Sequence, residues 1–165
     1  MSKSRFLGHE CPLARALDQI GDWWTLLVVR ECMYGTRRFE GFRRQLGISR
    51  AVLVKRLHSL TEAGILEKIT SDKDKRAVEY CLTAKGLDLW PLMVTLLIWS
   101  NRHVVKGDVV SVHHQDSACG IEQICAVNES RQPIPFKELS LVCGKDASPA
   151  FSQRIKSINS AWRKP

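Results

Sequence analysis

The sequence predicts a mainly α-helical fold with one small β-hairpin, followed by a small C-terminal α+β appendage. Up to residue 64, apolar residues recur with the helical period between capping residues and glycines. The segments 65–70 and 77–82 then alternate apolar and polar residues on either side of a charged turn. From residue 104 the chain changes to short β-prone runs punctuated by Gly, Pro and Cys. We therefore expect two units, residues 1–103 and 104–165.

Length and composition limit the class of protein. The chain has 165 residues, of which 44% are apolar, so it can bury one core and is not a disordered chain. Its N-terminus lacks the continuous apolar segment of a cleavable signal peptide, and its most apolar run, Leu89 to Trp99, is too short to cross a bilayer. We expect a cytoplasmic protein with no membrane partner, whose six cysteines are mainly reduced.

Positive charge is concentrated in one part of the chain. Lys and Arg number 25 against 17 Asp and Glu. Eleven of the basic residues, but only five of the acidic ones, lie between Thr36 and Arg76. Such a concentration favours a polyanionic partner over general solubility.

The first part of the chain contains three short helices in close succession. Pro12 begins the first helix, and Gly21 breaks it. Asp22 can cap the second helix, which is largely apolar. Residues 39–46 form the third, which Gly47 closes. A fourth helix follows after about three residues, which is the connection length of a helix-turn-helix.

The fourth helix is amphipathic. Ser49 stands at its N-cap, Leu53, Leu57 and Leu60 form its apolar face, and Gly64 ends it. Between the apolar positions the helix carries Ser49, Arg50, Lys55, Arg56 and His58. These side chains offer donors that suit phosphates and the guanine edge, and a helix of about 15 residues fits a DNA major groove.

A hairpin and a long helix follow. Residues 65–70 and 77–82 are predicted as two strands joined by a basic turn. Thr83 can cap a helix that runs to about His103 and is kinked or restarted at Pro91. This helix has more apolar surface than one terminal helix can cover, so we expect a partner helix from a second subunit.

Three blocks of the sequence carry a family resemblance: CPLARALDQIGDWWTLLVVRECMYGTRRFEGFRRQL, GISRAVLVKRLHSLTEAGILEK and RAVEYCLTAKG. In this order they resemble the HxlR family of bacterial winged-helix transcriptional regulators, which are relatives of the MarR group. The resemblance covers about residues 11–102. It implies a winged helix-turn-helix that binds double-stranded DNA, with the hairpin as a wing on the minor groove and the first and last helices forming a homodimer.

The resemblance also assigns DNA-binding residues by position. The groove-facing part of the recognition helix would be Ser49, Arg50, Ala51, Val54, Lys55 and Arg56. Residues near the phosphates would be Arg37, Arg38, Arg43 and Arg44, and the wing tip would be Lys73, Lys75 and Arg76. The chain departs from the family at Arg50, where Pro is common, and at Asp74-Lys75, where Pro-Pro is common. Both changes replace rigid residues with charged ones.

Cysteines add two further hypotheses. Cys11 matches an N-terminal cysteine that some family members use to sense electrophiles or oxidants, although a buried structural thiol is the alternative. Longer members carry a C-terminal tail that resembles a zinc ribbon. Here the residues that could form such a site are Cys119, Cys125, Cys143 and His113 or His114. Because a CxxC knuckle is missing at Cys125, we expect a degenerate module that has lost its metal, with no cofactor.

The expected function is that of a homodimeric repressor that binds a pseudo-palindromic operator and responds to a small effector or to thiol oxidation. One of Trp23 and Trp24 should lie in the core, and the other should line a cavity for such an effector. No phosphate loop, nucleophile elbow or HExxH motif indicates an enzyme. The alternatives are a metal- or thiol-dependent enzyme, or a protein-interaction module, centred on the C-terminal unit.

Overall fold

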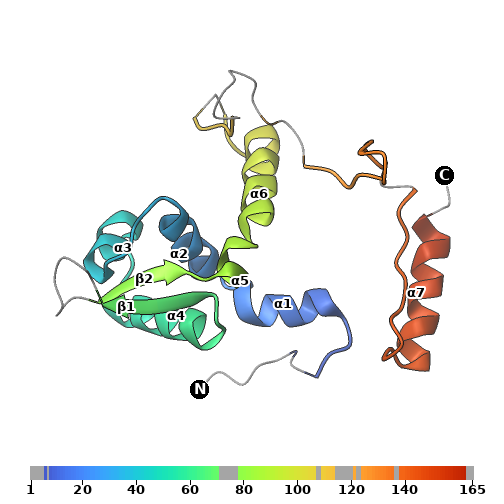
Figure 1. The fold of residues 1–165 in the computed structure, drawn as a ribbon, viewed down its shortest axis with the longest axis horizontal. Helices are drawn as coiled ribbons and strands as arrows, with labels where there is room; N and C mark the ends of the chain where they lie inside the picture. The colour runs from blue at the N-terminus through green and yellow to red at the C-terminus, as the bar shows by residue number, and fades with distance from the viewer. Residues whose placement is uncertain are drawn as a thin grey trace.

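The computed structural model describes residues 6, 8–70, 78–106, 109–113, 121, 124–135 and 138–162. Its elements, in chain order, are α1 (Pro12–Ile20), α2 (Trp23–Met33), α3 (Phe39–Leu46), α4 (Arg50–Glu62), β1 (Leu66–Thr70), β2 (Val78–Leu82), α5 (Ala84–Leu87), α6 (Trp90–His103) and α7 (Pro149–Trp162). In Figure 1, α2, α3, α4 and the hairpin form one cluster, from which α6 rises. The chain then crosses to α7 on the opposite side of the molecule.

The hydrophobic core lies inside the cluster of α2, α3, α4 and the hairpin. It consists of Val28, Val29, Phe42, Ile48, Leu53, Leu57, Leu60, Ile65 and Leu66. All of these side chains are buried, and they come from α2, α3, α4, β1 and the two connections that lead into α4 and β1. Because the core fixes α4 from behind, the opposite face of α4 is presented to solvent.

The predicted helix boundaries are confirmed by their caps. Asp22 accepts a hydrogen bond from the Trp24 backbone N–H, and Ser49 accepts one from the Val52 backbone N–H. Gly47 follows α3 with φ +60°, a left-handed conformation that favours glycine. The turn at Gly47 therefore sets the angle at which α4 leaves α3.

The wing is an antiparallel hairpin with Leu66 opposite Leu82 and Thr70 opposite Val78. A third chain segment joins its outer edge. Arg38 forms an isolated bridge with Glu79, and the Tyr80 backbone N–H donates to the Arg37 carbonyl over 2.8 Å. The segment that leads into α3 is therefore fixed to the wing.

The long C-terminal helix of the winged unit is restarted rather than kinked. The Thr83 hydroxyl caps α5 by accepting from the Gly86 backbone N–H, as its position predicts. A new helix, α6, begins at Trp90 with Pro91 in its first turn. Pro91 is tolerated there because the first backbone N–H groups of a helix have no intrahelical acceptor.

The C-terminal unit differs from the expected α+β module. It contains a helix, α7, but the β-prone runs at residues 109–112 and 136–143 form no strands in their described residues. Between residues 121 and 147, the described part contains one isolated bridge, Val127 with Pro133. At Leu141, the backbone groups that would pair with a neighbouring strand are bonded to the Asn159 side chain of α7 instead. The Leu141 N–H donates to Asn159 Oδ1, and the Leu141 carbonyl accepts from Asn159 Nδ2. A helix side chain thus replaces a neighbouring strand.

The start of α7 is tied to the N-terminal segment. Glu10 accepts hydrogen bonds from the Ser148 backbone N–H over 2.7 Å and from its hydroxyl over 2.6 Å. These two bonds lower the pKa of Glu10 below its usual range.

Among the described helices, none is both long and apolar enough for a membrane span.

Candidate DNA-binding interface

Helix α4 separates buried from exposed side chains as a recognition helix requires. Leu53, Leu57 and Leu60 are buried in the core. The opposite side exposes Arg50, Ala51, Val54, Lys55 and His58, and Ser49 is exposed at the N-cap. The structure therefore brings five of the six predicted groove-facing residues onto one solvent-facing surface, which we call the α4 surface (Ser49, Arg50, Ala51, Val54, Lys55).

Two members of the α4 surface are chemically informative. The Arg50 guanidinium carbon lies 5.3 Å from the centroid of the Phe39 ring, so a cation–π contact orients this side chain against α3. Val54 is 51% exposed although it is apolar. An exposed apolar side chain between donors suits contact with a thymine methyl group.

Arg56 is placed differently from the other predicted residues. Its side chain is only 19% exposed and forms an ion pair of 2.9 Å with Asp22. Asp22 also caps α2 through the Trp24 backbone N–H. Arg56 thus joins α4 to the start of α2 and is not part of the α4 surface. The helical pattern alone did not indicate this ion pair, because its partner is distant in sequence.

The arginines predicted near phosphates lie on α3 and on the segment before it. Arg43 pairs with Glu40 over 3.0 Å within α3, and Arg38 pairs with Glu79 of the wing over 3.5 Å. Arg37 and Arg44 are exposed. These four residues precede the α4 surface in the chain, and all are exposed and so accessible to a phosphate.

The wing contributes one residue that sequence reasoning missed. Lys68 of β1 is exposed, and its ammonium nitrogen lies 5.8 Å from the centroid of the Tyr80 ring. The signal was available, because Lys68 is one of the eleven basic residues between Thr36 and Arg76 and lies on a strand of the predicted hairpin. The predicted wing-tip residues Lys73, Lys75 and Arg76 lie outside the described residues.

The cysteines occupy different environments. Cys11 is half-buried at the N-cap of α1, where its backbone N–H donates to the His9 ring nitrogen over 3.0 Å. Burial raises the pKa of the Cys32 thiol to about 12, and nearby Cys81 and Glu31 add to the effect. A thiol with this pKa carries almost no thiolate at neutral pH, so we expect Cys32 to be unreactive there.

The metal hypothesis for the C-terminal unit involves residues that are only partly described. Cys125 and Cys143 are free thiols, whereas Cys119 and His114 lie outside the described residues. Within the described part of the chain, no group of three or more His, Cys, Asp or Glu side chains could hold a metal ion.

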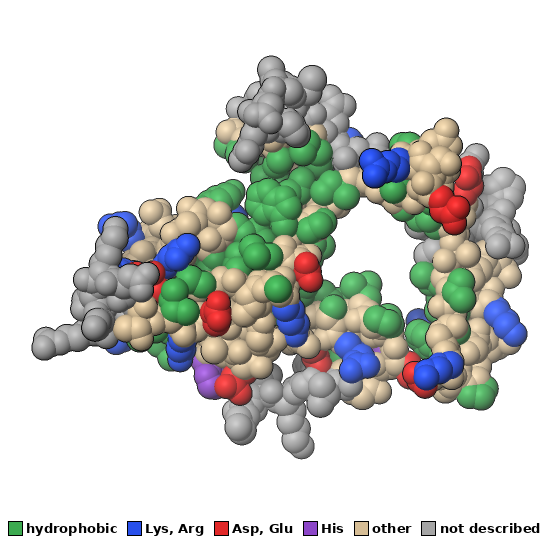
Figure 2. Space-filling view, viewed as in Figure 1, with side chains coloured by type: hydrophobic (Ala, Val, Ile, Leu, Met, Phe, Trp, Pro, Cys, Tyr) green, Lys and Arg blue, Asp and Glu red, His purple; other side chains and the backbone are tan. Residues whose placement is uncertain are grey.

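Apolar side chains are exposed on α1 and α6. Leu13 and Leu17 of α1 are at least half exposed, and α1 has no buried residue. On α6, Leu92 and Trp99 lie seven residues apart and are also exposed. Figure 2 shows apolar side chains gathered over α6 and the adjoining part of the winged unit. We call Leu13, Leu17, Leu92 and Trp99 the apolar face.

The two adjacent tryptophans divide as predicted. Trp24 packs against the hydrophobic core, whereas Trp23 is exposed and lines a cavity between α2 and α6. Their ring centroids are 5.4 Å apart. The cavity is therefore in contact, through this pair, with the core that supports α4.

Comparisons with known proteins agree with this geometry. The family model described as HxlR-like helix-turn-helix matches residues 19–108. An uncharacterised HTH-type transcriptional regulator of Mycobacterium tuberculosis is 35% identical over 144 residues, covering 79% of this chain and 89% of that protein. The regulator YybR of Bacillus subtilis, also uncharacterised, is 32% identical over 100 residues, covering 59% of this chain and 80% of that protein.

Solved structures show the same fold. PA1607, a candidate transcription factor, superposes with a TM-score of 0.76 at 29% identity, covering 83% of this chain and 97% of that one. PA1374 of Pseudomonas aeruginosa superposes with a TM-score of 0.63 at 33% identity, covering 87% of this chain and 99% of that one. The redox regulator HypR in its oxidised form superposes with a TM-score of 0.52 at 28% identity, covering 58% of this chain and 100% of that one. With the winged helix, the α4 surface and these matches together, the chain belongs to the HxlR family of helix-turn-helix transcriptional regulators.

Proposed function

We propose that this regulator is a homodimeric repressor that inserts α4 into the major groove of a pseudo-palindromic operator. The observation that carries the proposal is the α4 surface, where exposed donors and an exposed valine stand opposite three buried leucines. Arg50 and Val54 would contact base edges, and Ser49, Ala51 and Lys55 would line the groove beside them. As a ligand of chromosomal DNA, the protein would act in the cytoplasm.

Phosphate contacts would come from the flanking basic residues. We assign this role to Arg37, Arg38, Arg43, Arg44 and Lys68, and to the predicted wing-tip residues Lys73, Lys75 and Arg76. Such contacts release counterions, so affinity should fall steeply as salt is raised. They would position the protein on the duplex, whereas α4 would select the sequence.

The apolar face supports the homodimer. An α1 without any buried residue and an α6 that exposes Leu92 and Trp99 need a partner surface of the same kind. A two-fold axis through this face would present two α4 helices to half-sites about one helical turn apart. In this proposal, residues 1–103 bind DNA and dimerise, and residues 104–165 form a separate, smaller unit.

Thiol oxidation is a proposed input at Cys11. The residue is partly accessible and is the N-cap of α1, a helix that belongs to the proposed dimer interface. A modification there would change the packing between subunits and hence the spacing of the two α4 helices. The similarity to the oxidised redox regulator HypR is in keeping with this role.

A mobility-shift assay tests the proposal. The full chain is mixed with DNA from upstream of its own coding sequence, with random DNA as competitor, before and after mild oxidation. The expected result is a shift that random DNA does not remove and that oxidation abolishes in the wild type but not in Cys11→Ser. A specific shift that is unchanged by oxidation would contradict the sensor role of Cys11 but not the repressor. No specific shift at any low salt concentration would contradict the repressor itself.

A further inference from the structure

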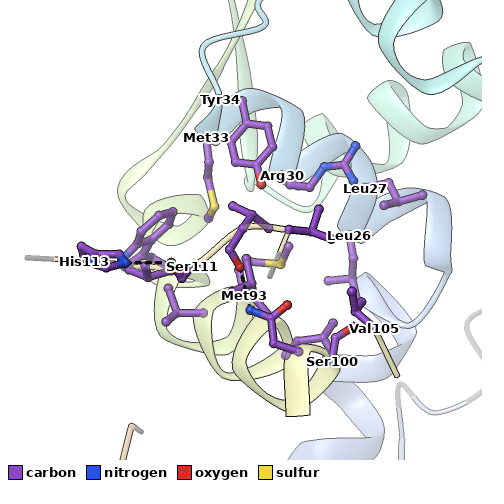
Figure 3. Close-up of a pocket in the computed structure, with 18 of the residues that line it drawn as sticks. Leu26, Leu27, Arg30, Met33, Tyr34, Met93, Ser100, Val105, Ser111 and His113 are labelled. Atoms are coloured by element: carbon purple, nitrogen blue, oxygen red, sulfur yellow. Dashed lines mark hydrogen bonds between the residues drawn. The ribbon is translucent and has the colours of Figure 1, made fainter. Parts of the chain in front are cut away.

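A cavity of about 800 Å³ opens between α2, α6 and the segment 109–113 (Figure 3). This volume is within the range of small-molecule sites in proteins. Figure 3 shows Met33 and Met93 on opposing walls, with Leu26 and Leu27 on the α2 side. The cavity uses a different side of α6 from the apolar face, because Met93 and Leu97 line it whereas Leu92 and Trp99 do not.

The wall opposite the two helices is held in place by hydrogen bonds. Asn101 of α6 donates from its side-chain amide to the Val110 carbonyl over 2.6 Å. Within the wall, the Ser111 hydroxyl and the His113 Nε2 are 2.7 Å apart. Because these polar groups bond one another, the surface that faces the cavity is mainly apolar.

The cavity has one fixed positive charge on its lining. Arg30 of α2 lines it, and the described lining residues include no Asp or Glu. One terminal nitrogen of Arg30 bonds the Glu31 carboxylate over 2.7 Å, and the guanidinium carbon lies 5.6 Å from the Tyr34 ring centroid. The Nε of Arg30 is buried and has no hydrogen-bond partner. Because this nitrogen is buried, a ligand in the cavity would meet the accessible part of the Arg30 side chain, which is 35% exposed and lines the cavity.

We propose that this cavity binds an aromatic acid, with its ring between α2 and α6 and its anionic group beside Arg30. Planar rings suit a lining of methionine and aromatic side chains, since thioethers and ring edges pack well against aromatic faces. The anionic group suits the guanidinium, which offers a planar set of donors. The inference rests on the proposed function, to which it adds the chemical class of an effector.

The same arginine connects the cavity to the DNA-binding elements. Glu31 is only 6% exposed, and its second oxygen accepts from the Thr36 hydroxyl over 3.2 Å. Thr36 directly precedes the Arg37 and Arg38 segment that is fixed to the wing and leads into α3. An anion that competes for Arg30 would weaken the Arg30–Glu31 pair and alter this connection. Ligand and DNA should therefore change one another's affinity.

Two fluorescent probes test the site without DNA. The first is 8-anilinonaphthalene-1-sulfonate, an aromatic anion, and the second is N-phenyl-1-naphthylamine, which has the same rings without the charge. The expected result is saturable binding at one site per chain, with the anion bound about tenfold more tightly. The double variant Arg30→Met/Glu31→Gln, which leaves no buried unpaired carboxylate, should remove this preference and retain the neutral probe.

Two matched variants on α6 locate the probe. Leu97→Trp fills the cavity and should prevent binding of both probes, and Ser100→Trp serves the same purpose if the first variant does not fold. Thr95→Trp, at an exposed position of α6 that neither lines the cavity nor belongs to the apolar face, should leave binding unchanged. Equal affinities of the two probes for the wild type, or loss of binding only in Thr95→Trp, would overturn the inference. Because no DNA is present, either outcome would leave the repressor proposal standing.

Discussion

At the scale of single residues, the basic side chains of α4 fall into two groups: some are exposed to a DNA partner, and one forms an ion pair within the fold. Lys55 is exposed, whereas the adjacent Arg56 is paired with Asp22 and mostly buried. A half-buried ion pair loses more when one partner is removed than a surface pair does, because the remaining charge stays poorly solvated. Neighbouring basic residues should therefore respond differently to mutation.

Substitution of Arg56 should lower stability rather than DNA selectivity. We expect Arg56→Met to reduce the free energy of unfolding by about 1 to 3 kcal/mol, between the values for surface and buried pairs. Lys55→Met is the matched control, and it should weaken DNA binding with little effect on unfolding. Urea denaturation and mobility shifts measure the two quantities. An Arg56→Met protein of normal stability that has lost operator selectivity would show that Arg56 reads bases.

Cys32 should resist alkylation in the folded protein. Its thiol pKa of about 12 leaves almost no thiolate at pH 8, and iodoacetamide reacts with the thiolate. Mass spectrometry of timed samples should find Cys125, which is exposed, modified well before Cys32. Labelling in urea is the control, and there all six cysteines should react. Equal rates at Cys32 and Cys125 without urea would contradict the burial of Cys32.

At the scale of elements, the sequence predicted those whose ends have local signals. Asp22, Ser49 and Thr83 cap the helices that they were expected to cap, because an N-cap needs only a side-chain oxygen and a nearby N–H. The strands expected in the C-terminal unit have no such local end signals, and none forms in its described residues. A strand depends on a partner, and at Leu141 the backbone is bonded by Asn159 of α7 instead.

The junction between the wing and α5 depends on a glycine. Gly86 is buried, and a Cβ atom there would collide with the Ile65 carbonyl oxygen and the Leu82 side chain. We expect Gly86→Ala to destabilise the protein by about 1 to 3 kcal/mol through overpacking, as thermal unfolding would show. Gly144→Ala is the control, because its Cβ would meet no atom within 4 Å. Equal melting temperatures for the two variants would contradict the close packing of α5.

At the scale of the whole molecule, large apolar side chains of two helices are exposed to solvent in the single chain. Leu13 and Leu17 are exposed on α1, and Trp99 is exposed on α6. The sequence predicted excess apolar surface on the last helix of the winged unit. It predicted a cavity beside one of the two adjacent tryptophans, but not that Arg30 would line it, because that lining requires α2, α6 and residues 109–113 to meet.

The apolar face should hold two subunits together. We expect Leu17→Glu with Trp99→Glu to convert a dimer into a monomer of normal secondary structure, because a charge in an apolar interface is poorly solvated. Light scattering after gel filtration measures the mass. The control is Val142→Glu, a change at a fully accessible apolar residue of the C-terminal unit. A wild-type monomer at high concentration, or a double variant that remains dimeric, would place the interface elsewhere.

The central claim is that α4 reads an operator sequence, and selection from a random DNA library tests it most directly. Wild-type protein should enrich a two-fold-symmetric site with half-sites about one helical turn apart. Arg50→Ala should enrich a site that is degenerate at one position of each half-site, with a loss of discrimination of about 1 to 3 kcal/mol there. Arg44→Ala should weaken binding and leave the motif intact. Enrichment of no motif, or of one unchanged by Arg50→Ala together with Val54→Ala, would contradict the claim.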